Sequence, residues 1–261
     1  MECRKWYKRD GRAPSLIQSL VFLKMQLTLQ FLGLALLSSF VTCSAYEFVR
    51  INKNDSMLLV VDHQIGLFQL VRDFTAEEYR NNILAHAAAG KVFNLPTILT
   101  TSAETGPNGP LPKEIVEMHP NAPYIRRQGE VDAWDNADFR AAVKATGKSQ
   151  VIMAGITTDV CTTFLALSLL QEGYTVFANA DASGTFSAQV AANANDRMRA
   201  AGVNVVSQFA VINDLMRDWR DTPGSLQILP YFDTYSAQYS YLARGHAAAV
   251  LNGTILPGET V

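Results

Sequence analysis

Three side chains of this chain have types and places that suit nucleophilic catalysis: Cys161, Asp62 and Arg127. Cys161 follows an apolar run, residues 151–154, and a glycine turn, where we expect the first turn of a helix. A helix N-terminus favours the ionised form of a thiol, and its free N–H groups can hold an oxyanion. Cys161 is therefore a candidate nucleophile, with a small buried inert thiol as the alternative.

Asp62 and Arg127 could support that nucleophile. Asp62 ends the apolar run 57–61, and Arg127 lies in the segment 123–129, ahead of the run that leads to Cys161. A carboxylate can accept the thiol proton, and a fixed cation can hold both groups and lower their pKa values. Taken singly, a strand-end aspartate commonly caps a helix or forms a turn, and a loop arginine is commonly a solvated charge. The three residues make a site only if the fold brings them together.

Short apolar runs alternate with amphipathic segments along the body of the chain. This alternation predicts a parallel sheet covered by helices on both faces, with the chemistry just beyond the carboxyl ends of the strands. We expect one α/β domain over residues 46–246 and a tail over 247–261 with little regular structure. The expected strands are 57–61, 97–100, 151–154, 175–178 and 203–206, and the expected helices are 76–93, 136–146, 159–172, 187–201 and 210–219.

The charge of the body argues against polyanionic partners. Residues 1–45 carry six Lys and Arg against two Asp and Glu, a net +4, which leaves 16 against 22, a net −6, for residues 46–261. An acidic body fits neither nucleic acid nor an anionic membrane surface.

Residues 1–45 resemble a secretory signal peptide. A basic start precedes an apolar core over residues 27–37, and small residues at Cys43 and Ala45 suit cleavage before Tyr46. Cleavage there would remove Cys3 and Cys43 and leave Cys161 without a disulfide partner. We expect a secreted protein with no stable membrane partner, with an uncleaved membrane anchor or an organellar presequence as the alternatives.

Several segments together resemble the isochorismatase-like cysteine hydrolases, and within them the YcaC-type hydrolases most closely. The resemblance runs from about Val49 to Arg220. The segments that carry it are Leu59-Val60-Val61-Asp62-His63-Gln64, Thr100 to Pro110, Ala133-Trp134-Asp135-Asn136, Ala154-Gly155-Ile156-Thr157-Thr158-Asp159-Val160-Cys161 and Asp181 to Phe186.

The resemblance implies a fold and a set of catalytic roles. The fold is a three-layer, Rossmann-like α/β sandwich with a mainly parallel sheet of about six strands. In it Asp62 is the general base, Cys161 the nucleophile, and Arg127 stands where the wider family has lysine. An arginine cannot carry a proton, so its role would be electrostatic and orienting. The family also has a cis peptide at the position of the Ile156–Thr157 bond, which would turn the N–H groups of Thr157 and Cys161 toward one oxyanion.

The implied activity is hydrolysis of a small non-peptide amide through a thioester acyl-enzyme, without a cofactor. Related nicotinamidases hold a metal with an aspartate and two histidines after the second strand. Residues 101–110 contain no histidine, so we predict no metal. Three other histidines are scattered and are expected to be solvated or capping: His86, His119 and His246.

Four further residues are candidates for a substrate pocket: His63, Glu104, Asn108 and Trp134. For His63, core packing is at least as good an interpretation as substrate contact. For Trp134, an oligomer contact is as good an interpretation as a place in the pocket. We expect a homo-oligomer acting on a small molecule. The alternatives are a non-catalytic oligomeric scaffold and a secreted interaction protein. A dinucleotide site has little support, because Gly66 is the lone glycine after the first strand.

Overall fold

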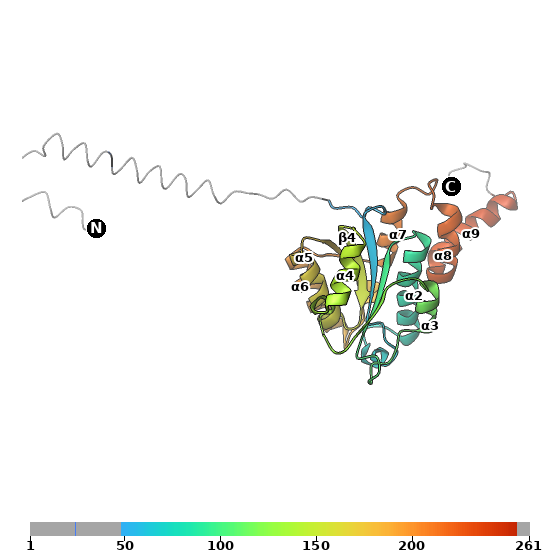
Figure 1. Cartoon of the computed structure of the whole chain (residues 1–261). Helices are drawn as coiled ribbons and strands as arrows, with labels where there is room; N and C mark the ends of the chain where they lie inside the picture. Colours follow the sequence, from blue (N-terminus) through green and yellow to red (C-terminus); the bar gives the residue numbers. More distant parts are fainter. Residues whose placement is uncertain (1–23, 25–47, 255–261) are drawn as a thin grey trace, which may run out of the picture. The chain divides into compact units, whose positions relative to one another are not determined.

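The computed structural model describes residue 24 and residues 48–254 of the 261-residue chain. The described residues contain a six-stranded parallel sheet (Figure 1) in the order β3-β2-β1-β4-β5-β6. Its strands are β1 (Ser56–Val61), β2 (Thr97–Ser102), β3 (Tyr124–Arg127), β4 (Gln150–Gly155), β5 (Thr175–Asn179) and β6 (Asn204–Val206). Five of them lie at the apolar runs that predicted them. The apolar pattern does not predict β3, because half of this four-residue strand is arginine.

Helices cover both faces of the sheet, so the predicted three-layer α/β fold is confirmed (Figure 1). One face packs against α4 (Ala137–Ala145), α5 (Thr163–Gln171) and α6 (Ala188–Ala201) around a core that includes Leu59, Met153 and Phe139. The other face carries α2 (Ala76–Val92), with α3 (Lys113–Met118), α7 (Gln208–Met216) and α8 (Ser225–Tyr235) packed around it. The last helix, α9 (Ala237–Leu251), packs against α8.

Local sequence signals explain where these helices begin. The Thr75 side chain and Glu78 form a capping box at the start of α2. Asn136, Ser187 and Ser207 cap α4, α6 and α7 with their side-chain oxygens. The cap at Ser207 starts α7 at Gln208, two residues before the predicted start, and the helix ends at Met216 rather than at residue 219.

The C-terminal region is more regular than we predicted. Helix α9 runs through Leu251, so the expectation of little regular structure from residue 247 is wrong for residues 247–251. The physical reason is composition: residues 247–251 are Ala-Ala-Ala-Val-Leu, which favour a helix, and the glycine and proline that suggested a tail lie beyond them. Helix α8 was not predicted because Pro230 lies inside it.

The predicted signal peptide, residues 1–45, lies outside the described residues except for Lys24, and so do residues 255–261. Within the described part of the chain, no helix combines the length and the apolar character needed to span a bilayer.

Candidate active site

The site lies where the order of the sheet reverses. Strands β1 and β4 are neighbours, with Val61 paired to Gly155 at their carboxyl ends. Gly155 suits this close approach, because a Cβ there would lie 2.5 Å from the carbonyl oxygen of Val61. Asp62 directly follows β1 and Cys161 lies in the turn after β4, so the two meet at the point where open α/β sheets bind their ligands.

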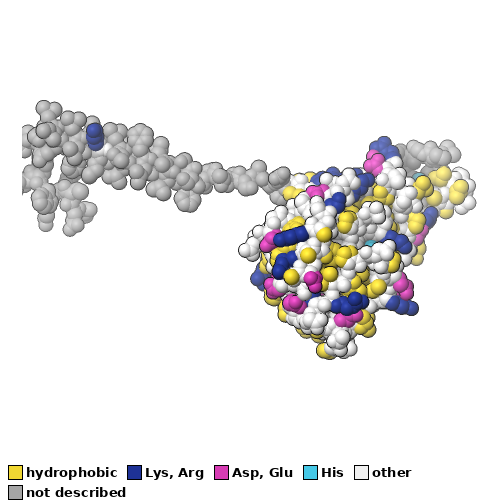
Figure 2. Space-filling model, viewed as in Figure 1, with side chains coloured by type: hydrophobic (Ala, Val, Ile, Leu, Met, Phe, Trp, Pro, Cys, Tyr) yellow, Lys and Arg dark blue, Asp and Glu magenta, His cyan; other side chains and the backbone are white. Residues whose placement is uncertain are grey.

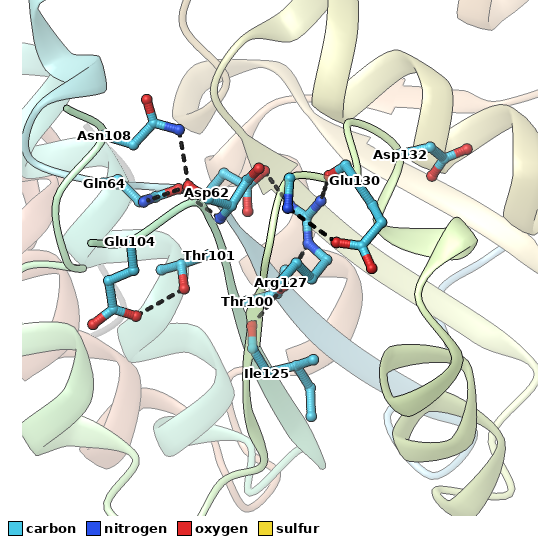
Figure 3. Close-up of polar contacts among 12 residues, drawn as sticks. Asp62, Gln64, Thr100, Thr101, Glu104, Asn108, Ile125, Arg127, Glu130 and Asp132 are labelled. Atoms are coloured by element: carbon cyan, nitrogen blue, oxygen red, sulfur yellow. Dashed lines mark hydrogen bonds and ion pairs between the residues drawn. The ribbon is translucent and has the colours of Figure 1, made fainter. Parts of the chain in front are cut away.

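Asp62 and Arg127 form an ion pair in which both side chains are fully buried. Arg127 reaches Asp62 from the end of β3, two strands away, and its Nη2 donates to the Asp62 Oδ2 (Figure 3). Its Nη1 donates to the backbone oxygen of Glu130 and its Nε to Thr100 Oγ1, at 3.0 Å. All three nitrogens of the guanidinium group therefore have acceptors, and its orientation is set by three separate segments of chain.

Thr100 contacts both members of the ion pair. Its hydroxyl accepts from Arg127 and donates to the carbonyl oxygen of Ile125, at 3.0 Å, and its own carbonyl oxygen accepts the N–H of Asp62, at 3.0 Å (Figure 3). Thr100 is a functional residue that the sequence pattern does not predict. The only sequence feature that could have pointed to Thr100 is its hydroxyl near the carboxyl end of a predicted strand. Such hydroxyls are common in sheets and usually have no catalytic role.

A loop after β3 supplies the remaining support. The Glu130 carboxylate accepts from the Asn136 side chain, at 2.9 Å, and from the N–H of Gly129, at 3.1 Å. These hydrogen bonds, that of Asn136 first, lower the pKa of Glu130 to about 2. An ionised Glu130 thereby holds the loop whose carbonyl oxygen accepts from Arg127.

Cys161 lies in a π-helical turn, Thr158–Thr162, rather than in the first turn of a regular α-helix. The N–H of Thr162 donates to the oxygen of Thr157, five residues back, at 3.1 Å, and α5 begins only at Thr163. The residue is half-buried and bears a free thiol. A π-turn at a strand-to-helix junction is a common feature of functional sites.

The thiol of Cys161 interacts with the carboxylate of Asp62. Burial, followed by the charge of Asp62, raises the pKa of Cys161 to about 12, against a smaller lowering by Arg127. Burial also raises the pKa of Asp62, although Arg127 and the thiol oppose that shift. The expectation that Arg127 would lower the pKa of the thiol below its ordinary value is therefore wrong, because desolvation and the adjacent carboxylate outweigh the effect of Arg127.

The geometry leaves one carboxylate oxygen for the thiol. Asp62 Oδ2 is held by Arg127, whereas Oδ1 is buried and has no hydrogen-bond partner among the described residues. Oδ1 is therefore the carboxylate oxygen that can take up a proton without breaking the ion pair.

The Ile156–Thr157 peptide bond is cis, at the position that the family resemblance implies. The backbone of Thr157 lowers the pKa of the Cys161 thiol, against the larger effects that raise it. A donor directed at the nucleophile is also close to where an oxyanion would form after attack.

The loop after β2 carries two of the predicted pocket residues (Figure 3). Asn108 donates to the oxygen of Ser102, at 2.8 Å, and Glu104 accepts from Thr101, at 2.9 Å, and pairs with Arg126. These contacts shape the loop. Contact of either residue with a substrate stays a prediction.

Gln64, the last residue of the family motif 59–64, links two strand ends. Its amide oxygen accepts the N–H of Ser102, at 2.8 Å, and its amide nitrogen donates back to the oxygen of Ser102, at 3.0 Å (Figure 3). Gln64 therefore ties the segment after β1, which carries Asp62, to the end of β2.

The other two predicted pocket residues lie in the core. His63 is fully buried, contacts the rings of Tyr79 and His86 edge-on, and has Nε2 2.8 Å from the oxygen of Ala182. Trp134 is buried in the hydrophobic core against Phe139. His63 follows β1 directly after Asp62, whose left-handed backbone ends the strand, and packs between the rings of α2 and the oxygen of Ala182.

The expectation of a solvated or capping histidine is wrong for His86, whereas His119 is the C-cap residue of α3. His86 is fully buried between the oxygen of Leu59 and the side chain of Asn179. His119 is half-buried and contacts the oxygen of Ala87, at 2.8 Å. No group of three or more His, Cys, Asp or Glu side chains placed to bind a metal occurs among the described residues.

Comparison with known proteins adds a family and several relatives. The isochorismatase domain model matches residues 56–208. The curated protein "Probable hydrolase YcaC" of Escherichia coli K12 is 53% identical over 174 residues, which cover 67% of this chain and 84% of that protein.

Two solved structures agree with the fold over the same part of the chain. YcaC from Pseudomonas aeruginosa, solved with hexane-2,5-diol and covalent acrylamide, is 49% identical with a TM-score of 0.75, and the match covers 78% of this chain and 100% of that one. The Escherichia coli YcaC product, described as an octameric hydrolase of unknown specificity, is 48% identical with a TM-score of 0.75. The match covers 78% of this chain and 99% of that one.

Proposed function

This chain belongs to the isochorismatase family and is a hydrolase, and from that premise we propose that it hydrolyses a small non-peptide amide through Cys161. The single observation that carries this proposal is the coupling of the Cys161 thiol to Asp62, whose other oxygen is held by a buried arginine. A nucleophile next to a base that a third group orients is the arrangement of covalent catalysis.

The first half of the reaction forms an acyl-enzyme. The Cys161 sulfur attacks the amide carbon while its proton moves to Asp62, because the raised pKa of the thiol requires that the proton leave as the C–S bond forms. The backbone N–H of Thr157 stabilises the oxyanion. Asp62 then gives the proton to the leaving nitrogen, the C–N bond breaks, and an amine or ammonia departs from a thioester.

The second half consumes water. Asp62 takes a proton from the water that attacks the thioester carbon and returns it to the sulfur as the C–S bond breaks, which releases a carboxylic acid and restores the thiol. Arg127 exchanges no proton in either half. It keeps Asp62 oriented and limits how far burial raises the pKa of the carboxyl group.

The Pseudomonas aeruginosa relative, which was solved with covalent acrylamide, supports the presence of a reactive nucleophile in a protein of this kind. Acrylamide is a small amide with an electrophilic alkene, and soft nucleophiles such as thiolates add to it. For this chain we propose Cys161 as the residue that would react.

A turnover assay with trapping tests the proposal. A panel of small aliphatic and aromatic amides and ureides is screened for release of ammonia, and the intact mass of the rapidly quenched protein reveals an acyl group on Cys161. We expect Cys161→Ser to lose both turnover and adduct while its circular dichroism stays unchanged. Full turnover in Cys161→Ser would reject the cysteine mechanism, and an inactive wild type over a broad panel would favour the non-catalytic scaffold.

We also propose that the chain forms a homo-oligomer, which the octameric state of the Escherichia coli relative supports. Secretion is a separate proposal that rests on residues 1–45 alone. N-terminal sequencing of protein recovered outside the cell should begin near Tyr46, whereas a full-length product retained inside would contradict secretion.

A further inference from the structure

Helix α9 leaves the body of the protein after its first two turns. Tyr239 anchors its start: the ring stacks on Trp219, with centroids 5.3 Å apart, and also contacts Phe209 and Phe232. Ser240 is the buried residue of the helix, and its hydroxyl donates to Asp233 of α8. Figure 1 shows α9 continuing past α8, at the far side of the α2 and α8 layer from the sheet.

Beyond the anchor, α9 is apolar and largely uncovered. Tyr241 is 76% exposed, Leu242 is 68% exposed and Leu251 is 86% exposed. The four residues 245–248, a full helical turn, are all exposed. Figure 2 shows the hydrophobic side chains that gather on this projecting part of the body. Exposed large apolar side chains that lie together are typical of an interaction surface. A helix of 15 residues is also marginal without packing.

One face of the helix is available for a partner. Tyr241, Gly245 and Ala248 follow the i, i+4, i+7 spacing, so they share a face, and Leu242 borders it. Tyr239 and Ala243, which are less exposed, lie on the opposite side toward α8. We call Tyr241, Leu242, Gly245 and Ala248 the α9 face.

We propose that the α9 face docks a second copy of this chain. The inference rests on the homo-oligomer proposed above and identifies the surface that forms it. The α9 face contains small residues that allow another helix to approach closely, flanked by two large apolar side chains for it to cover.

The charge of the helix favours an identical partner over a charged one. Between residues 237 and 254 the ionisable groups near neutral pH are Arg244 and His246, and the guanidinium of Arg244 is paired with Asp233. The α9 face carries no charge, so a second neutral face complements it without burying an unpaired ion. At about 1.5 Å per residue the helix is about 22 Å long, too short for the roughly 30 Å of a bilayer core.

Two arginine variants of the full chain test the surface without disturbing the fold. Ala248→Arg and Leu242→Arg place a charged side chain on exposed positions of the α9 face, and arginine has good helix propensity. Ala200→Arg is the matched control, at an exposed position in the last turn of α6, where a cation is favoured. Light scattering after size exclusion gives the molar mass of each.

We expect wild type and Ala200→Arg to have the same mass, a multiple of 28.7 kDa, and both α9 variants to give smaller species with unchanged far-ultraviolet circular dichroism. Full-mass oligomers of Ala248→Arg and Leu242→Arg would overturn the α9 assignment and leave the proposed oligomer intact. A monomeric wild type would reject both the α9 assignment and the proposed homo-oligomer. Binding of that monomer to phosphatidylcholine vesicles, lost in Leu242→Arg, would show that a membrane surface covers α9 instead.

Discussion

The Asp62 carboxylate accepts a hydrogen bond from the Arg127 guanidinium group, and both side chains are fully buried. Asp62 adopts a left-handed backbone conformation, with φ of 55°, and its N–H donates to the oxygen of Thr100. Aspartate is among the few residue types that tolerate this region. The backbone and the ion pair together direct one carboxylate oxygen to Arg127 and leave the other without a hydrogen-bond partner among the described residues. The pair therefore orients a base, and its value for stability alone is small because desolvation offsets much of the attraction.

Removing the Asp62 charge should speed alkylation of Cys161 while it stops hydrolysis. The carboxylate contributes to the raised pKa of the thiol, so Asp62→Asn increases the thiolate fraction, by about tenfold for each unit by which the pKa falls. Iodoacetamide labelling at pH 7.5, followed by mass spectrometry of the peptide that contains Cys161, measures the rate. Glu104→Gln is the control, since Glu104 pairs with Arg126. A slower rate in Asp62→Asn would show that the carboxylate activates the resting thiol.

Arg127→Lys should be a severe change. The guanidinium group donates hydrogen bonds to Asp62, to Thr100 and to the backbone oxygen of Glu130 at the same time. A lysine ammonium on a flexible stem cannot reproduce that planar arrangement. We expect kcat to fall by about 10²-fold or more, the size of effect that loss of an oriented acid–base group produces. Steady-state kinetics on an amide substrate give the answer. Near wild-type kcat would mean that the positive charge alone is sufficient.

Thr100 should act as a positioning residue. Thr100→Val leaves the buried Arg127 Nε without its acceptor, which costs about 1–3 kcal/mol of folding free energy and loosens the ion pair. A lower kcat with an unchanged KM is expected, together with a shifted acid limb of the pH–rate profile. Thr100→Ser keeps the hydroxyl and should restore both kcat and the pH–rate profile to those of the wild type. If Thr100→Val lowered stability but left kcat and the pH profile unchanged, its role would be structural only.

Acid should destabilise the fold below about pH 6.5 through two buried histidines. Burial lowers the pKa of His63 to about 3 and that of His86 to about 4, from an ordinary 6.5. Between the lowered pKa of each folded histidine and the ordinary 6.5, the unfolded chain binds more protons than the folded chain. The free energy of unfolding therefore falls as the pH falls, by up to about 1.4 kcal/mol per pH unit for each group.

Urea unfolding at pH 8, 6.5, 5.5 and 4.5 tests this expectation. The free energy of unfolding should be flat at the alkaline end and should decline below pH 6.5. In His63→Leu, which removes one of the two groups, the decline should be shallower. A slope in His63→Leu equal to that of the wild type would show that His63 does not contribute.

Much of the scaffold follows from local sequence. Apolar runs of four to six residues mark strands, and Ser, Thr and Asn caps mark helix starts, because burial and backbone hydrogen bonding act over a few neighbouring residues. The placement of Asp62 after β1 and Cys161 after β4 follows from that alternation, and the parallel sheet then requires both to lie at the same edge. An arginine pair hides strand β3 and an internal proline hides helix α8 from such patterns. The patterns also do not predict α3 and α9.

The sequence by itself determined which residues end the strands and which family motif they belong to. Only the tertiary structure decided how those residues behave. The pKa of Cys161 depends on burial and on a carboxylate 99 positions away, and the orientation of Arg127 depends on Thr100, 27 positions away. His63 and Trp134 lie in the core, because packing between layers and not the local motif sets which side chains are covered. Desolvation and contacts between distant segments exist only once the chain has folded, and they are the terms that set the chemistry of this site.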